Sequence, residues 1–277
     1  MTATCRTASA AEVALMLDWA AKEGWNPGLD DAAAFHAADP EGFFVAEADG
    51  APVAAISVVN HDPTMAFLGL YLCRPDYRGR GIGFALWQHA LAHAGDRTVG
   101  LDGVAAQQAN YAKSGFALAG ATRRFMGQLE AVTAEGHRPA RPADLASVAA
   151  LDRAACGYDR PAFLSAWLAD SATRKTVVAE DGGTLTGFAT IRACREGCKI
   201  GPVIAKDAEA ALALAASAAA TLPGQPLFID AAPGQDALAA RLEALGFQET
   251  FATARMYRGA APAPNGTLQA VATMELG

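Results

Sequence analysis

Hydrophobic positions along this chain recur with two different spacings, and each spacing predicts one kind of element. Val13, Met16, Leu17 and Ala20 recur every three or four residues, which is typical of a helix with one buried face. Short runs rich in Val, Ile, Phe and Leu, bounded by Gly, Asp or Pro, predict strands. We therefore expect helices over residues 10–23, 81–93, 142–155 and 210–222 and a short helix ending at residue 115, with strands over residues 42–48, 52–59, 66–73, 98–102, 176–181, 185–191, 227–230 and 268–274.

The chain also repeats itself weakly. Five segments recur in the same order, namely 42–50 with 176–183, 52–59 with 185–191, 99–102 with 227–230, 114–116 with 245–247, and 124–126 with 255–257. In each copy the first segment reads as a strand that runs into a hairpin turn at Asp-Gly, and the second as the returning strand. One such pair would carry little weight, but five in register indicate two copies of one unit.

The boundary between the copies is predicted near residues 130–141, because Gly136, Pro139 and Pro142 suit a linker. We therefore expect two domains, residues 1–130 and residues 137–277. Helices and strands mix without strict βαβ alternation, so the expected class is α+β, with a twisted mixed sheet flanked by helices in each unit. The last predicted strand, 268–274, is free to pair with either unit.

Composition and charge narrow the classes of partner. The chain has 277 residues, of which 52% are hydrophobic and 18% charged, and its net charge is −7. The longest basic run is Arg123-Arg124, so we expect no nucleic-acid partner, because phosphate backbones need clustered cations. Glu12 and Asp18 interrupt the apolar N-terminal region, which argues against a signal peptide.

The remaining composition favours a cytoplasmic protein without a metal. The longest uncharged stretch is broken by Pro223, well short of the roughly 20 residues that a membrane helix needs, so no membrane span is expected. The five cysteines are odd in number and scattered, which suits a reducing compartment. Cys194 and Cys198 have no second Cys or His pair to complete a metal site, so we expect no metal.

The run from Arg74 to Trp87, RPDYRGRGIGFALW, carries the clearest chemical signal. It connects a predicted strand to a predicted helix, so its glycines expose backbone N–H groups at a helix N-terminus, where an anion binds well. The groups expected to face that anion are the side chains of Arg78 and Arg80 and the N–H groups of Gly79, Gly81 and Gly83. A pyrophosphate fits such a site, and with it coenzyme A or a nucleotide. The turn lacks the Gly-Lys-Ser/Thr ending of a P-loop, which disfavours a nucleotide-binding enzyme.

A second segment, NYAKSGF over residues 110–116, follows the next predicted strand. Combined with the pattern Arg78-x-x-Gly81-x-Gly83, it resembles the GNAT superfamily of acyl-CoA N-acyltransferases. The resemblance covers residues 42–126 well, and the whole chain looks like a tandem subgroup whose second half is a degenerate GNAT-like domain. The resemblance implies that acetyl-CoA is the cosubstrate. The residues expected to hold it are Tyr71, Leu72 and Cys73 along the pantetheine arm and Arg78, Gly79, Arg80, Gly81, Ile82, Gly83 and Phe84 around the pyrophosphate.

The same resemblance makes Tyr111, four residues before Gly115, the general acid for the departing thiolate. The amine would attack the thioester directly, without an acyl-enzyme, so a base or a water chain must take its proton. Family members often carry an Asn seven residues before this Tyr, but the position here is Val104. The residues left to supply the missing amide are Gln107, Gln108 and Asn110.

The sequence does not fix the base, because no carboxylate lies on the strand 66–73. Glu23 is the first candidate, since it lies beside Trp25 and Asn26. In the family the first helices form the wall on the acceptor side, so we expect Trp25 and Asn26 to bind the substrate. Glu47 and Asp102 are weaker candidates for the base.

The second copy has no equivalent of the glycine-rich turn. Its corresponding stretch, 201–210, has no glycine after Pro202, and Asp207 and Glu209 would repel a pyrophosphate. We therefore expect this copy not to bind coenzyme A, and instead to cover the sheet edge or shape the acceptor pocket.

The predicted function is transfer of an acetyl group from acetyl-CoA to a primary amine of a small molecule. Two alternatives stay open at this point, a non-catalytic acyl-CoA sensor and a peptide or protein N-acetyltransferase. A homodimer is compatible with this prediction, although the sequence leaves the oligomeric state open.

Overall fold

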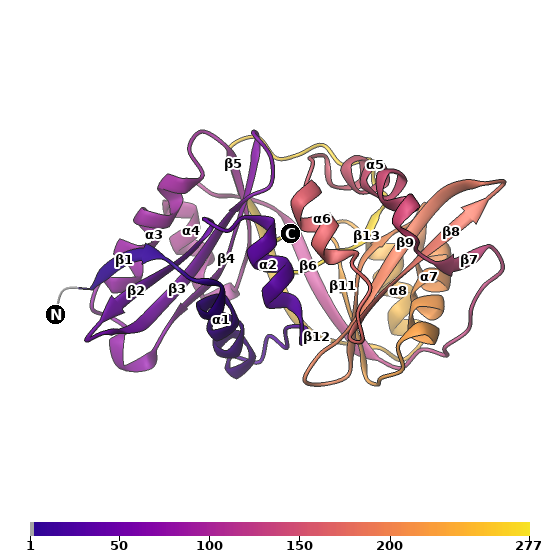
Figure 1. The fold of residues 1–277 in the computed structure, drawn as a ribbon, viewed down its shortest axis with the longest axis horizontal. Coiled ribbons are helices and arrows are strands. Elements are labelled where there is room, and N and C mark those ends of the chain that lie inside the picture. The colour runs from indigo at the N-terminus through magenta and orange to yellow at the C-terminus, as the bar shows by residue number, and fades with distance from the viewer. Residues whose placement is uncertain (1–2) are drawn as a thin grey trace.

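The structure is a computed structural model that describes residues 3–277, and it has two α+β units side by side (Figure 1). The N-terminal unit contains β1 (Thr4–Thr7), α1 (Ala10–Lys22), α2 (Asp31–Ala38), β2 (Phe43–Ala48), β3 (Ala51–Asn60), β4 (Met65–Cys73), α3 (Ile82–His93), β5 (Thr98–Gly103), α4 (Gln108–Lys113) and β6 (Ala117–Gly127). The C-terminal unit contains β7 (His137–Pro139), α5 (Leu145–Cys156), α6 (Pro161–Trp167), β8 (Arg174–Asp181), β9 (Thr184–Ala193), β10 (Cys198–Ile204), α7 (Ala208–Thr221), β11 (Leu227–Ala231), α8 (Asp236–Ala244), β12 (Gln248–Arg258) and β13 (Leu268–Ala270).

Local sequence accounts for many of these boundaries. Helix α1 begins at a capping box, in which Ser9 and Glu12 satisfy each other's backbone N–H groups. The hairpin between β2 and β3 turns at Asp49 and Gly50, whose φ angles of 52° and 75° are those a tight primed turn requires. The predicted class, α+β with a twisted mixed sheet, is confirmed.

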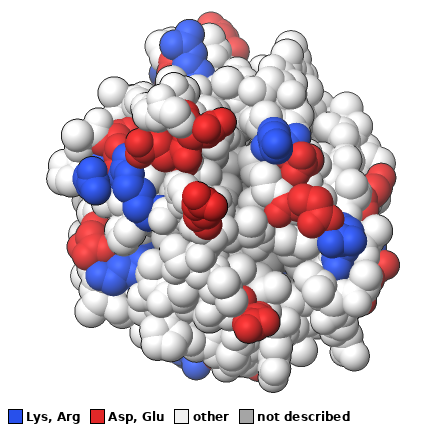
Figure 2. All heavy atoms as spheres, turned by 90° about the vertical axis from the view of Figure 1, so that its right-hand side faces the viewer, with Lys and Arg blue, Asp and Glu red and all other residues white. Residues whose placement is uncertain are grey.

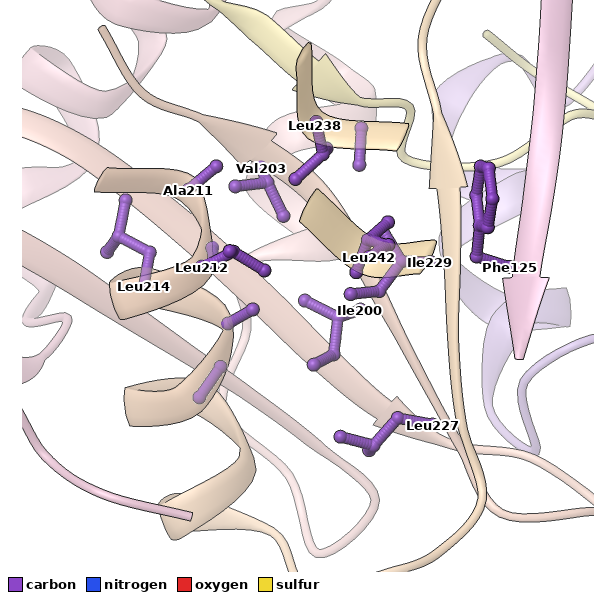
Figure 3. Close-up of a cluster of buried hydrophobic side chains, with 14 of the residues drawn as sticks. Phe125, Ile200, Val203, Ala211, Leu212, Leu214, Leu227, Ile229, Leu238 and Leu242 are labelled. Carbon is purple, nitrogen blue, oxygen red and sulfur yellow. The ribbon is translucent and has the colours of Figure 1, made fainter. Parts of the chain in front are cut away.

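In each unit, helices cover both faces of that unit's part of the sheet. In the N-terminal unit, α3 and α4 cover one face through Leu86, Trp87 and Tyr111, while α1 and α2 cover the other. In the C-terminal unit, α7 and α8 pack on one face, and Figure 3 shows Leu212 and Leu242 from these helices meeting Ile200 and Ile229 from the strands. Helix α5 packs on the opposite face. The two cores therefore repeat one layered plan, as the sequence repeat predicts.

The two units are tied together by exchanged strands. The thirteen strands found in residues 3–277 form one sheet, and in its middle the order is β5-β12-β6-β11. Strand β12 belongs to the C-terminal half of the sequence but lies beside β5, while β6 lies beside β11. The sequence boundary near residue 130 is therefore not a boundary between separate sheets.

Two reciprocal ion pairs fasten this exchange. Arg124 on β6 makes a bidentate pair with Asp230 on β11, with N–O distances of 2.6 and 2.8 Å. Arg255 on β12 makes the matching pair with Asp102 on β5, at 3.0 and 2.7 Å. All four side chains are almost fully buried. Arg124 and Arg255 stand at one repeated position, and Asp102 and Asp230 stand at another. The duplication therefore supplies two arginines and two aspartates whose buried charges compensate one another.

Each unit also has a place where neighbouring strands separate. In the N-terminal unit β4 pairs with β5 only from Met65 to Leu68, and Leu70 takes a left-handed φ of 48°. Beyond this point the strands diverge. In the C-terminal unit the corresponding space between β10 and β11 is filled by β13, which pairs with both strands.

The last predicted strand, 268–274, is shorter than expected. Pairing stops at Ala270, and the chain then turns at Thr273, whose hydroxyl oxygen accepts from the N–H groups of Glu275 and Leu276. Residues 271–277, here called the closing segment, are buried between the two units, near the label C in Figure 1. The extended pattern ends because the segment leaves β10 and β11 and passes over β4 at Gly69.

Charged side chains are mixed on the outer surface of the C-terminal unit. Figure 2 shows that basic and acidic groups lie among one another on this end face. Arg138, for example, pairs with both Asp144 and Glu180. This face of the molecule therefore presents small groups of mixed sign rather than one basic block.

Candidate active site

A groove lies where β4 ends and α3 begins, and we call it the cofactor groove. Its lining residues are Glu23, Trp25, Tyr71, Leu72, Cys73, Tyr77, Arg78, Gly79, Gly81, Gly83, Phe84, Val104 and Gln107. Most residues predicted to hold acetyl-CoA are therefore brought together here. Leu70 and Tyr71 fall in a register shift against β3 and beyond the last pair with β5, so this part of β4 offers backbone groups to an extended amide-bearing arm.

The N-terminus of α3 is left open to an anion. Its N-cap is Gly81, with a φ of 78°, and no side chain accepts a hydrogen bond from the first turn. A Cβ built on Gly79 or Gly81 would meet no atom within 4 Å, so the turn is open on the side of these two residues. Unpaired N–H groups, the helix dipole and open space together fit a pyrophosphate.

The remaining residues of the turn have distinct environments. Gly83 permits a close contact, because a Cβ there would lie 2.8 Å from the Tyr71 hydroxyl oxygen. Arg78 donates to the Cys73 carbonyl oxygen at 2.9 Å, and the Arg80 guanidinium stacks on the Tyr77 ring. The Ile82 side chain is buried in the core, whereas that of Phe84 is 61% exposed.

A second hollow, the inner pocket, continues from the cofactor groove between the diverging strands. It holds about 620 Å³ of empty space, part of it open to solvent. Its lining residues are Trp25, Leu68, Gly69, Leu70, Tyr71, Leu101, Asp102, Val104, Gln107, Tyr111, Arg124, Phe251, Thr253, Met274 and Glu275. Four of these also line the cofactor groove, so the two hollows meet. Phe251 and Thr253 come from the exchanged strand β12, and both units therefore build this pocket.

Tyr111 lies at the inner pocket on α4. Its ring stacks on Trp87 with 5.4 Å between centroids. Burial, and to a smaller degree the neighbouring Tyr71, raises the pKa of Tyr111 to about 12. The phenol is therefore protonated at neutral pH, which is the state that a proton donor needs. No residue in the described part of the chain hydrogen-bonds this hydroxyl, so it is available to a bound molecule.

The structure places the other predicted substrate and base residues differently. Trp25 lines both hollows, but Asn26 lines neither; its amide bonds the backbone of Glu196 on the β9–β10 hairpin. Glu23 lies in the cofactor groove, where its side chain is half exposed and pairs with Arg78 at 3.0 Å. Of the weaker candidates, Asp102 is held by Arg255 and Glu47 by Arg6. Glu23 therefore lines the cofactor groove but not the inner pocket.

Among the amides named as replacements for the missing Asn, one lies at the site. Gln107 lines both hollows, and its side-chain oxygen accepts from Asn110 at 2.9 Å. Its NH₂ group has no partner among residues 3–277 and remains available as a donor.

Sequence reasoning missed Glu275. It is 5% exposed, lines the inner pocket, and its carboxylate makes no hydrogen bond or ion pair with any described residue. No motif marks it, but a signal was present. Glu275 is the one charged residue in the stretch from Gly259 to Gly277.

The C-terminal unit lacks each part of this arrangement. Its helix α7 is capped by Asp207, whose carboxylate accepts from the Ala210 N–H at 2.9 Å. Strand β13 fills the space between β10 and β11. Leu242 occupies the position of Tyr111, since Phe247 N–H bonds its carbonyl just as Phe116 N–H bonds that of Tyr111.

Comparison with known proteins agrees with the two-unit plan. The acetyltransferase (GNAT) family matches residues 11–116, and an acetyltransferase (GNAT) domain family matches residues 148–270. A holothin acyltransferase from Pseudoalteromonas sp. (strain SANK 73390) is 35% identical over 280 residues, covering 99% of this chain and 94% of that protein. This chain belongs to the GNAT family. It is a tandem GNAT acyltransferase.

Solved structures share the fold of this GNAT protein over nearly its whole length. A putative acetyltransferase from Pyrococcus horikoshii superposes with a TM-score of 0.82 at 20% identity, covering 99% of this chain and 96% of that one. A tandem GNAT protein from the clavulanic acid biosynthesis pathway has a TM-score of 0.63 at 18% identity, covering 95% of this chain and 100% of that one.

Within residues 3–277, no three His, Cys, Asp or Glu side chains are grouped so that they could hold a metal ion. None of the helices described there has the length and apolar character needed to cross a bilayer.

Proposed function

We propose that this GNAT protein transfers an acetyl group from acetyl-CoA to the primary amine of a small molecule. The observation that carries the proposal is the junction of the cofactor groove with the inner pocket at Trp25 and Tyr71, with Tyr111 inside the inner pocket. An acetyl-CoA molecule lying along β4 with its pyrophosphate at α3 would place its acetyl thioester at this junction, where the acceptor enters. The acyltransferase relative supports group transfer over mere binding of acyl-CoA.

The inner pocket favours a small and largely apolar acceptor. Aromatic and aliphatic side chains form most of its walls, including Trp25, Phe251 and Met274. The charged pairs Asp102–Arg255 and Arg124–Asp230 are satisfied within the protein, so they offer little to a polycation. The closing segment forms one wall, which suits a compact molecule better than a polypeptide chain.

Each residue has a role in the proposed transfer. Acetyl-CoA, when bound, supplies an activated acetyl thioester. N–H groups of the turn from Gly79 to Phe84 hold the pyrophosphate, and the backbone at Tyr71 hydrogen-bonds the thioester carbonyl oxygen as negative charge develops on it. Trp25 and Phe251 orient the acceptor. Tyr111 hydrogen-bonds the sulfur and gives it a proton as the C–S bond breaks.

The test is a thiol-release assay with acetyl-CoA in which the acceptors are a panel of small primary amines and, separately, holothin, alongside calorimetry with acetyl-CoA alone. We expect micromolar binding of acetyl-CoA and amine-dependent release of free thiol. Saturable binding without thiol release across the panel would instead identify a sensor. Release only with peptides would identify a peptide or protein N-acetyltransferase.

A further inference from the structure

The closing segment is fixed from both sides, so the position of Glu275 is well defined. His61 Nε2 lies 2.8 Å from the Leu276 carbonyl oxygen, and Arg160 donates to the Gly277 carbonyl oxygen at 2.5 Å. Gly69 makes room for the segment, because a Cβ there would lie 2.1 Å from the Glu275 carbonyl oxygen. The absence of a side chain at Gly69 thus lets the segment pass directly over β4 at the point where the strands diverge.

The Glu275 carboxylate is unusual among the buried acids of this molecule. Asp31, Asp102, Asp152 and Asp230 each pair with an arginine. Glu275 pairs with none of the described residues, although it is 5% exposed and lines the same pocket as Tyr111. A buried carboxylate without a partner is costly, so its retention at this pocket points to use by a bound molecule.

Nearby cations stabilise the negative charge without neutralising it through direct contact. Burial lowers the pKa of Arg124, but the carboxylates of Asp230 and, more weakly, Glu275 raise it overall above its ordinary value. Burial lowers the pKa of Lys199, and Glu275 is one of the carboxylates that act against this shift. The Lys199 ammonium nitrogen itself lies 3.3 Å from the Trp25 carbonyl oxygen. Neither cation comes within ion-pairing distance of the Glu275 carboxylate, so its oxygens stay available to the pocket.

We propose that Glu275 is the catalytic base of the transfer, taking the proton that the acceptor amine loses. This inference rests on the proposed function. As the amine nitrogen bonds the acetyl carbon, the nitrogen becomes positively charged and its N–H becomes acidic. Glu275 takes that proton, the C–S bond breaks, and Tyr111 protonates the sulfur. The proton then passes from the Glu275 carboxyl group to the Tyr111 phenolate through water, which restores both residues and leaves an amide and a free thiol.

The presence of Glu275 and Tyr111 in one pocket also explains how Tyr111 can act as a proton donor despite its high pKa. A phenol with a pKa of about 12 is a poor donor toward a thiolate with a pKa of about 8.5. Full transfer becomes favourable only when the phenolate is reprotonated from a stronger acid. Protonated Glu275, in the same pocket as Tyr111, is such an acid. Glu23 lines the cofactor groove and not the inner pocket.

The decisive experiment compares Glu275→Gln with Glu23→Gln in the full-length protein, using whichever amine gives the best wild-type turnover. We expect Glu275→Gln to lower kcat at least 100-fold while the acetyl-CoA dissociation constant changes less than threefold. Glu23→Gln should mainly raise KM for acetyl-CoA, because it releases Arg78. As a further readout, formate should restore part of the activity of Glu275→Ala but leave the wild type unchanged.

Each other outcome has a defined meaning. A folded Glu275→Gln protein with kcat within threefold of wild type would overturn the assignment. A rise in amine KM at unchanged kcat would make Glu275 a binding group and would also overturn it. If Glu275→Gln does not fold, Glu275→Asp decides, since retracting the carboxylate by one methylene should lower kcat at least tenfold. A wild-type protein inactive with every amine would refute the proposed function itself, which is a separate result.

Discussion

The two units of this protein follow one plan, but they differ at the helix end and at the strand gap that form the cofactor groove in the first. In the N-terminal unit the α3 N-terminus is capped by Gly81 and its first N–H groups are free, whereas Asp207 caps α7 with its own carboxylate. The strands diverge around an empty space in the first unit and around β13 in the second. Tyr111 presents a hydroxyl where the second unit has Leu242.

We propose that the second unit has no acetyl-CoA site because its own groups occupy the corresponding places. The Asp207 carboxylate lies at the helix end where the first unit would hold a phosphate, β13 lies where it would hold the pantetheine arm, and Leu242 stands at the position of the proposed acid, Tyr111. The Asp207 carboxylate and β13 each satisfy backbone groups that would otherwise need a ligand or water, which stabilises the second unit. Meanwhile it contributes Phe251, Thr253 and Glu275 to the pocket of the first unit.

The largest expected effect comes from closing the one open helix end. Gly81→Asp should reduce acetyl-CoA affinity at least 100-fold, because a carboxylate beside the N–H groups repels the pyrophosphate and imitates Asp207. Calorimetry measures the effect. Gly234→Asp is the matched control, since Gly234 has a φ of 81° and equally open surroundings but lies in the C-terminal unit. Normal binding by folded Gly81→Asp protein would refute the pyrophosphate site.

The next effect concerns the acid. Tyr111→Phe should lower kcat about 100-fold with little change in acetyl-CoA affinity, because only the hydroxyl is removed and the ring still stacks on Trp87. Steady-state kinetics and calorimetry measure the two quantities separately. Tyr257→Phe serves as control, because that ring lies outside both hollows. Equal losses of turnover and affinity would exclude Tyr111 from the chemistry.

The parts that sequence could predict are the local ones. The turn around Gly81 and the helix carrying Tyr111 depend on a few neighbouring residues, so short motifs reveal them. The repeat likewise gives the order of elements in both units. By contrast, β6 and β12 carry the same pattern, with Arg124 and Arg255 at matching positions, so either strand could pair with Asp102 or with Asp230. Nothing local distinguishes the exchanged arrangement from the unexchanged one.

The inner pocket was harder still, because its walls come from segments far apart in the chain. Glu275 reaches Gly69 across more than half the sequence, and Asn26 is drawn away from the site by a bond to Glu196. Proximity in sequence favoured Glu23, which lies near Trp25 but outside the pocket that both units build. A lone charge in an apolar tail is a weak signal, and only the fold gives it meaning.

A third prediction concerns His61, which hydrogen-bonds the closing segment between the two units. Burial, with a smaller contribution from Arg160, lowers the pKa of His61 from 6.5 to about 4. Between these values the unfolded chain binds a proton that the folded protein does not, so the free energy of unfolding falls as the pH drops from 6.5 to 4, by about 3 kcal/mol at most. Urea unfolding at several pH values measures this.

His61→Gln isolates the effect, because Gln keeps a donor for the Leu276 carbonyl oxygen but does not titrate. We expect its stability to depend less on pH over the same window, with turnover at neutral pH within about threefold of wild type. An unchanged pH dependence would show that other groups control acid unfolding.

The smallest expected effect tests whether the Asp207 cap and strand β13 each suffice to keep acetyl-CoA out of the second unit. Asp207→Ala should lower the free energy of unfolding by about 1 kcal/mol, because it removes a helix cap, while Asp207→Asn should preserve the cap and most of the stability. Neither change should create a second acetyl-CoA site, because β13 still fills the space between β10 and β11. Calorimetry should therefore give one acetyl-CoA per chain for both variants. Binding of two would mean that the Asp207 carboxylate alone closes the second unit, and that β13 can be displaced by a ligand.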